Sequence, residues 1–254
     1  MGTGHTHPLF LPGNSPVHRL PPEVKVLAAL LFVACVVATP REVFWAFGGF
    51  LLVLTGVWLV AAIPLGWIAR RALIEAPFVV LAVLLPFAEG GQRVQVTGVS
   101  LSVTGLLAGW NIVIKGTLGV LTSLTLAATT VPRDLLIGLQ RLRMPTTITT
   151  IATLMLRYFE VIVGEARRMR IARISRGHDP RLLWQVGATA RGVGSLFLRS
   201  YERGERVHLA MLARGWNGQM PILHERTTDR RDWLRGLAPV AVAILLTSGA
   251  WWLG

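Results

Sequence analysis

Residues 43–63 read VFWAFGGFLLVLTGVWLVAAI, a run of 21 residues without a charged side chain. A helix of about 20 apolar residues spans the hydrocarbon core of a bilayer, and a charge inside that core is costly. The run is therefore expected to be a transmembrane helix. The whole chain agrees, since 52% of its 254 residues are hydrophobic and only 15% are charged, unlike the composition of a soluble domain.

Further apolar stretches precede and follow this run, and shorter spans are tolerated where helices pack together. They predict an all-α polytopic membrane protein with about five transmembrane helices. The expected spans are 24–39, 43–63, 72–88, 101–129 and 237–253. The expected organisation is a cytoplasmic amino-terminal segment (1–23), a four-helix transmembrane region (24–130), a basic cytoplasmic domain of long amphipathic helices (131–235) and a final transmembrane helix (236–254).

The net charge of +13 is concentrated in one region. Residues 133–235 contain 19 of the 26 Lys and Arg and 9 of the 13 Asp and Glu, so this region alone has a net charge of +10. Beside membrane spans, basic residues mark the cytoplasmic side. Arg70 and Arg71, expected in a short turn between the second and third spans, orient the chain in the same way. The amino terminus is therefore expected in the cytoplasm, and it lacks the pattern of a removable signal peptide.

Apolar residues in the basic region recur at helical spacing and predict two long amphipathic helices. The stripe of the first helix is interrupted at residues 165 and 166, and HDP at 178–180 separates the two helices. Residues 147–164 are apolar enough to enter the membrane partly. Arg157 and Glu160 argue against a lipid-exposed span there, so this segment is expected along or under the inner surface.

Each long helix is expected to end in the pattern Ala-x-x-x-Arg-Gly, as ARISRG at 172–177 and AMLARG at 210–215. A glycine after a helix takes the left-handed conformation easily, and an arginine in the last turn complements the helix dipole, so either copy alone is a plausible cap. Two similar ends in one chain also suit a partner with two-fold symmetry, whose carboxylates arginine can bind in a bidentate manner.

These motifs resemble the transmembrane coupling (T) subunit of energy-coupling factor transporters, and most closely the Q subunit of cobalt importers. The resemblance is carried by SPVHRLPPEVKVL at 15–27, by residues 129–177, which begin TTVPRDLL, and by AMLARG. It implies that two ATP-binding-cassette subunits dock on the two strings, bind ATP and Mg, and drive a small substrate-binding membrane subunit. The residues it implies for docking are Ala172, Arg176, Gly177, Ala210, Ala213, Arg214 and Gly215. The resemblance further implies that the protein lies in the cytoplasmic membrane of a prokaryote.

The sequence contains no G-x-x-x-x-G-K-[ST] phosphate loop and no catalytic motif, so no enzymatic activity and no bound cofactor are expected in this chain. His5 and His7 are weak candidates for metal ligands, and no metal site is expected. Gly105 and Gly109 offer a close helix contact. Lys115, inside a predicted span, either pairs with a carbonyl, extends toward the interface or holds the substrate-binding subunit.

Several alternatives remain at this stage. Cobalt as cargo rests on the resemblance alone, and nickel or a vitamin would fit the same subunit. The basic region also suits a membrane-anchored nucleic-acid-binding protein, although positive-inside charge and attraction to anionic lipid explain most of the excess. Few ionisable residues lie within the spans, which disfavours a self-sufficient permease or membrane enzyme.

Overall fold

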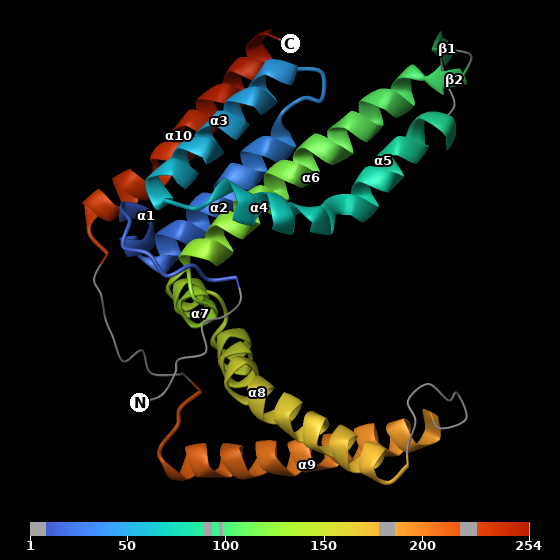
Figure 1. The fold of residues 1–254 in the computed structure, drawn as a ribbon. Helices are drawn as coiled ribbons and strands as arrows, with labels where there is room; N and C mark the ends of the chain where they lie inside the picture. Colours follow the sequence, from blue (N-terminus) through green and yellow to red (C-terminus); the bar gives the residue numbers. More distant parts are fainter. Residues whose placement is uncertain (1–8, 89–92, 97–98, 178–185, 219–227, 254) are drawn as a thin grey trace. The chain divides into compact units, whose positions relative to one another are not determined.

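The computed structural model describes residues 9–88, 93–96, 99–177, 186–218 and 228–253, and nearly all of them are helical (Figure 1). This confirms the predicted all-α polytopic class. The chain forms two compact units: the first comprises Met1–Gly138 with Glu225–Gly254, and the second comprises Leu139–His224.

The first unit is a bundle of helices joined by short connections. A small antiparallel hairpin of strands β1 (Arg93–Val96) and β2 (Val99–Ser102) precedes its longest helix. Its helices are α1 (Pro16–Arg19), α2 (Pro22–Ala38), α3 (Phe44–Ala61), α4 (Leu65–Ala72), the 3-10 turn η1 (Leu73–Glu75), α5 (Ala76–Ala88), α6 (Val103–Thr129), α7 (Pro132–Arg141), whose last three residues belong to the second unit, and α10 (Arg230–Leu253). The second unit contains α8 (Thr146–Ser175) and α9 (Val186–Ala213).

Four helices in the described part of the chain are long and apolar enough to cross a membrane: α3, α6, α8 and α10. Helices α3, α6 and α10 coincide with predicted spans. The predicted spans 24–39 and 72–88 correspond to shorter helices, α2 with 17 residues and α5 with 13. At a rise of 1.5 Å per residue, α5 is only about 20 Å long, less than the roughly 30 Å of a hydrocarbon core.

The structure corrects the predicted connection between the second and third spans. Arg70 and Arg71 lie in the last turn of helix α4 and not in a short turn, and the Arg71 guanidinium lies 4.0 Å from the centre of the Trp67 ring. The predicted span 72–88 is not one helix, because the 3-10 turn η1 separates α4 from α5. Pro77 explains this break, since it has no N–H to donate and its ring would clash with the carbonyl of Leu73 in a continuous helix.

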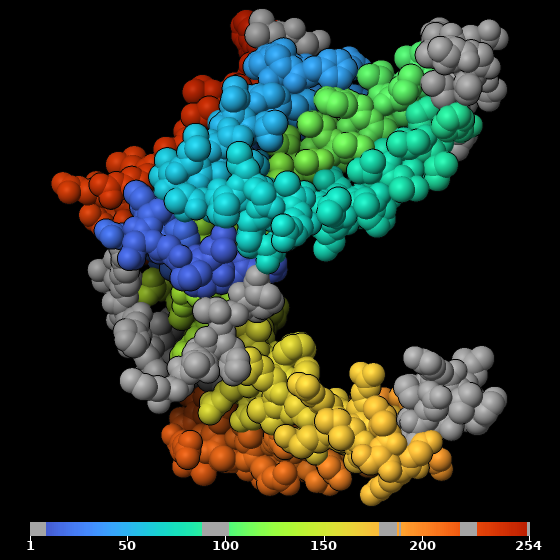
Figure 2. All heavy atoms as spheres, viewed as in Figure 1, coloured from blue at the N-terminus to red at the C-terminus, as the bar shows by residue number. Residues whose placement is uncertain are grey.

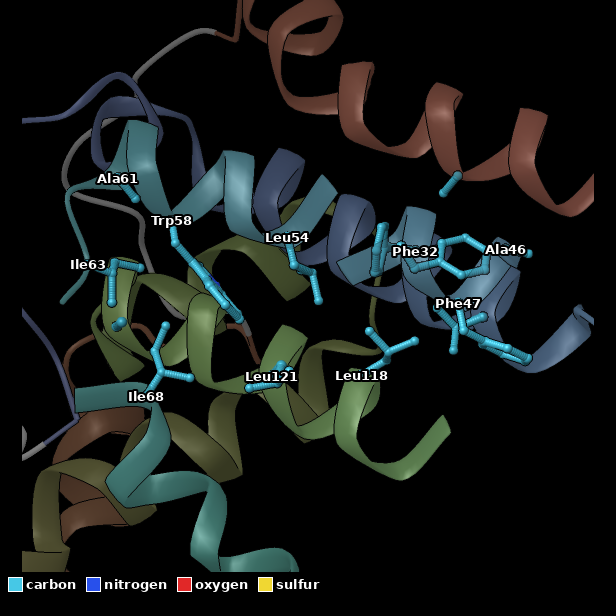
Figure 3. Close-up of a cluster of buried hydrophobic side chains, with 14 of the residues drawn as sticks. Phe32, Ala46, Phe47, Leu54, Trp58, Ala61, Ile63, Ile68, Leu118 and Leu121 are labelled. Atoms are coloured by element: carbon cyan, nitrogen blue, oxygen red, sulfur yellow. The ribbon is translucent and has the colours of Figure 1, made fainter. Parts of the chain in front are cut away.

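The core of the first unit lies where α2, α3 and α6 meet (Figure 3). Phe32 and Phe50 pack edge to face, with ring centres 5.6 Å apart. The indole Nε1 of Trp58 donates a 2.7 Å hydrogen bond to Thr125 Oγ1, so the one polar group of this buried ring is paired. Since lipid is as apolar as these side chains, close packing and such hydrogen bonds hold the helices together.

The outer side of α5 is uncovered, as the teal surface in Figure 2 shows. Each of its large apolar side chains there is more than half exposed: Phe78, Val80, Val83, Leu84 and Phe87. An apolar surface of this kind is unusual in a soluble protein and ordinary where lipid surrounds a helix.

The amino-terminal end of α2 is tied to distant parts of the first unit. The buried Lys25 Nζ donates to the carbonyls of His18 and Thr129, each at 2.9 Å, and the Thr228 hydroxyl donates to the Glu23 carboxylate. Burial lowers the pKa of the His18 imidazole, and the Lys25 charge acts in the same direction. These contacts hold the start of α2 to the end of α6 and to the segment before α10.

Gly105 and Gly109 of α6 lie against the backbone of α5. A methyl group at Gly109 would lie 2.6 Å from the Ala82 carbonyl oxygen, and one at Gly105 would lie 2.8 Å from Pro86 Cα. Backbone atoms cannot move aside as a flexible side chain can. The absence of a side chain at these positions therefore allows α5 and α6 to pack closely.

Gly109→Ala is expected to lower the stability of the first unit by about 1–3 kcal/mol, because the added methyl group overpacks the α5–α6 contact. The thermal unfolding midpoint of the purified chain in mild detergent measures this effect. Gly119→Ala is the matched control on α6, since a methyl group there meets no atom within 4 Å. Equal midpoints for the two variants would contradict the close-packing role of Gly109.

Candidate functional site

The two Ala-x-x-x-Arg-Gly strings occupy equivalent positions at the ends of α8 and α9. Each arginine directly follows the last helical residue, which is Ser175 in α8 and Ala213 in α9. Each glycine then has a positive φ, +80° at Gly177 and +77° at Gly215. This left-handed conformation favours glycine and stops the helix.

The hydrogen bonds of both ends match in the described residues. The Gly177 N–H donates to the Ile174 carbonyl at 3.0 Å, and the Gly215 N–H donates to the Leu212 carbonyl at 2.9 Å. At the second end the Trp216 N–H also donates to Met211 at 3.0 Å, which completes a Schellman motif. Helix capping thus accounts for the two glycines.

Hydrogen bonds and ion pairs within the described residues do not account for the two arginine side chains. The side chains of Arg176 and Arg214 are exposed, and neither makes a hydrogen bond or ion pair within the described residues. The alanines of the strings are exposed as well: Ala172, Ala210 and Ala213. Each helix end therefore presents a small-residue face and an unpaired guanidinium, which can make a bidentate bond to a carboxylate.

Helices α8 and α9 run antiparallel within the second unit. Glu165 of α8 accepts 2.8 Å bonds from Arg168 of its own helix and from Arg199 of α9. Further along, the Arg173 guanidinium lies beside Gly192. Because the helices are antiparallel, the two strings lie at opposite ends of α9, about 40 Å apart at 1.5 Å per residue.

The ion pair between Glu165 and Arg199 explains the interruption of the apolar stripe that was predicted at residues 165 and 166. A carboxylate replaces an apolar side chain where α8 meets Arg199 of α9. The sequence contained that signal, but it did not identify the partner of Glu165.

Lys115 extends from α6 to the end of α2. Its Nζ donates a 2.8 Å hydrogen bond to the Val37 carbonyl. Val37 belongs to the last turn of α2, whose carbonyls have no partner within their own helix. Of the roles considered for Lys115, the structure contains the pairing with a carbonyl, and a positive charge there also complements the negative end of the helix dipole.

No group of three potential metal ligands was found in the described residues. His5 and His7, and the HDP break at 178–180, lie outside the described residues. The structure therefore does not bear on these residues.

Comparison with known proteins groups this chain with transporter membrane proteins. A family model described as cobalt transport protein, CbiQ, matches residues 13–224. The cobalt transport protein CbiQ of Rhodobacter capsulatus is 28% identical over 228 residues, covering 88% of this chain and 86% of that protein. The energy-coupling factor transporter transmembrane protein EcfT of Bacillus selenitireducens is also 28% identical, over 223 residues and 82% of each chain. EcfT of Bacillus subtilis is 25% identical over 223 residues, covering 82% of this chain and 83% of that protein.

Lys115→Met is expected to lower the stability of the first unit by about 1–3 kcal/mol, because the Val37 carbonyl loses its donor. Thermal unfolding in detergent measures this loss, and Lys115→Arg should restore part of it. Thr117→Val is the control on α6, since the Thr117 hydroxyl donates to Val113 of its own helix and not to another helix of the described chain. An unchanged midpoint for Lys115→Met, combined with loss of partner subunits, would instead make Lys115 a partner contact.

Gly215→Ala is expected to destabilise the end of α9 by about 1–2 kcal/mol, the cost of a side chain in the left-handed region. Amide hydrogen exchange over residues 208–216 should become faster. Gly194→Ala is the control in the same helix, because a methyl group there meets no atom within 4 Å. Identical exchange in the two variants would argue against the capping role of Gly215.

Proposed function

The chain belongs to the CbiQ family of cobalt transport proteins, and from this premise we propose that it is the transmembrane coupling subunit of an energy-coupling factor importer. Two ATP-binding-cassette subunits bind and hydrolyse MgATP. This chain transmits their motion to a small membrane subunit that holds the substrate. The energy comes from the partners, since no phosphate loop occurs in the sequence.

One observation carries the proposal: the same exposed helix end occurs twice, each time with an arginine whose side chain has no partner among the described residues. Two equivalent ends suit two equivalent grooves, one on each subunit of an ATPase pair. Arg176 and Arg214 would each bind a carboxylate in a groove. Ala172, Ala210 and Ala213 would let the groove walls approach the helices closely.

The arrangement of α8 and α9 suggests how motion is transmitted. The ion pair of Glu165 with Arg199 joins the helices in the half of α8 that leads to Arg176. Arg214 lies at the opposite end of α9 from Arg176, and about 40 Å separates the two arginines. When nucleotide binding closes the ATPase pair, the distance between the two grooves changes. A hairpin whose helices are joined at the middle of α9 then responds by changing the angle between its helices.

The proposed cargo is the cobalt ion. It is supported by the name of the matching family and by that of the Rhodobacter capsulatus relative. The EcfT relatives are named for the transporter and not for a cargo, so nickel or a vitamin is the alternative. The proposed location is the cytoplasmic membrane, with the amino terminus and the docking helices on the ATP-containing side.

Arg214→Glu is expected to reduce cobalt uptake by about tenfold or more, because losing a charge-assisted bond worth roughly 1.5–3 kcal/mol weakens ATPase docking. Uptake of radioactive cobalt and co-purification of the ATPases are measured in parallel. Arg206→Glu is the charge-matched control on α9. The Arg206 side chain is 70% exposed, and its ion pair with Glu202 is long, at 4.0 Å, so it contributes little to stability. Full uptake with intact ATPase association in Arg214→Glu would refute the docking assignment.

The cargo and the partners are tested together by purifying the chain from its own cells in mild detergent. The expected companions are a pair of ATP-binding-cassette subunits and a small polytopic membrane protein that contains cobalt. Nickel or a vitamin on that companion would change the cargo and leave the coupling role intact. Purification of the chain alone, or with nucleic acid that dissociates at high salt, would contradict the transporter proposal.

A further inference from the structure

The second unit contains a cavity of about 400 Å³ between the first half of α8 and the second half of α9. Apolar side chains from both helices form much of its wall: Ile151, Leu154, Ile162, Val207 and Met211. Sites for small molecules have volumes of roughly 300–1,000 Å³ and the same mixture of apolar walls with a few polar groups.

Two polar atoms at this cavity are buried and have no hydrogen-bond partner among the described residues: Thr150 Oγ1 and Trp216 Nε1. Thr150 is 5% exposed. The hydroxyls of Thr149 and Thr153 instead donate to carbonyls of their own helix. An unmade hydrogen bond at a buried group costs about 1–3 kcal/mol, which a ligand with an acceptor oxygen would recover.

The charged and titratable groups that line the cavity favour an anion. Arg203 and His208 line it, and no carboxylate is among the lining residues that the structure describes. The His208 ring packs edge to face on the Trp216 indole, with ring centres 5.9 Å apart. The positively charged and hydrogen-bond-donating groups thus share a cavity whose remaining walls are largely apolar.

We propose that this cavity binds one hydrocarbon chain of an anionic amphiphile. The tail lies against the apolar walls, and the oxygens of a carboxylate or phosphate head accept hydrogen bonds from Trp216 Nε1 and Thr150 Oγ1. Arg203 neutralises the charge of the head. A free fatty acid and an anionic phospholipid share this chemistry, and both are available to a membrane protein.

An occupied cavity would also affect the second arginine-glycine string. Met211 lines the cavity, and its carbonyl accepts the N–H groups of Arg214 and Trp216. A bound chain would immobilise Met211 and Trp216 and would thereby stabilise the helix end that carries Arg214. The binding of the amphiphile rests on the cavity alone and does not depend on the proposed coupling function.

A pair of glycine substitutions tests the site. Gly204 lines the cavity on α9, and a Cβ atom there meets no atom within 4 Å, so Gly204→Leu should fill part of the cavity without a backbone clash. Gly194→Leu makes the same change on the same helix, also without an atom within 4 Å, at a residue that does not line the cavity.

The probes are 9,10-dibromostearate and a dibrominated phosphatidic acid, added to the full-length protein purified with its partner subunits. Quenching that is present in the wild type and absent in Trp216→Phe reports occupancy beside Trp216. It should saturate at one molecule per chain, with Kd raised about tenfold or more by Gly204→Leu and unchanged by Gly194→Leu. The tighter of the two probes identifies the source, and a brominated monoacylglycerol, which is uncharged, should bind more weakly.

Three results would overturn the proposal. These are equal quenching in the wild type and Trp216→Phe, an unchanged Kd in Gly204→Leu, and equal affinity for the uncharged probe. A photo-crosslinking residue at position 216 gives an independent measurement on the same complex. Crosslinks to lipid support the site, whereas crosslinks to a partner subunit would show that protein fills the cavity.

Discussion

The structure of the first unit depends on pairing the backbone carbonyls at the end of α2. In a hydrocarbon environment no water is available for these groups, so other side chains must donate to them. With 17 residues, α2 is about 25 Å long and ends short of a full bilayer core. Lys115 donates to Val37 and Trp251 donates to Ala38, while the Cys35 carbonyl accepts both the N–H and the hydroxyl of Thr39. Lys115 belongs to α6 and Trp251 to α10, so the same bonds that complete α2 assemble the bundle.

In the second unit, the last carbonyls of each helix are paired locally. The last carbonyls of α8 and α9 accept backbone N–H groups that follow the helix, and a glycine in the left-handed region makes this possible. No other element is needed to complete these ends. They therefore remain exposed, and their arginines keep their hydrogen-bonding capacity for groups outside the chain. In the first unit, by contrast, the donors of Lys115 and Trp251 are already bonded to backbone carbonyls of α2.

The sequence predicted those elements whose signal is local. The apolar runs of α3, α6 and α10, the helical spacing of α8 and α9, and the family all followed from the residues themselves. Features with short signals were missed, among them the hairpin of β1 and β2, helix α7, the eight-residue helix α4 that contains Arg70 and Arg71, and the break before Pro77. The partners of Lys115 and Glu165 could not be predicted, because they lie 78 and 34 residues away in sequence. The cavity at Thr150 and Trp216 likewise depends on how two helices meet.

The uneven packing of the second unit links its two candidate sites. Toward Arg176 the two helices are joined by the ion pair of Glu165 with Arg199, at the middle of α9, whereas toward Arg214 they form the walls of an open cavity of about 400 Å³. Close-packed interfaces transmit strain, while a cavity lets side chains rearrange at lower cost. A force applied at Arg214 would therefore rearrange side chains around the cavity, and would not move the rest of the hairpin, unless a ligand fills the cavity. A bound amphiphile would supply the missing contacts and allow motion at Arg214 to reach the joined half of the hairpin. On this argument the lipid would act as a component of the coupling device, and the stiffness of the hairpin would depend on the membrane from which that lipid comes.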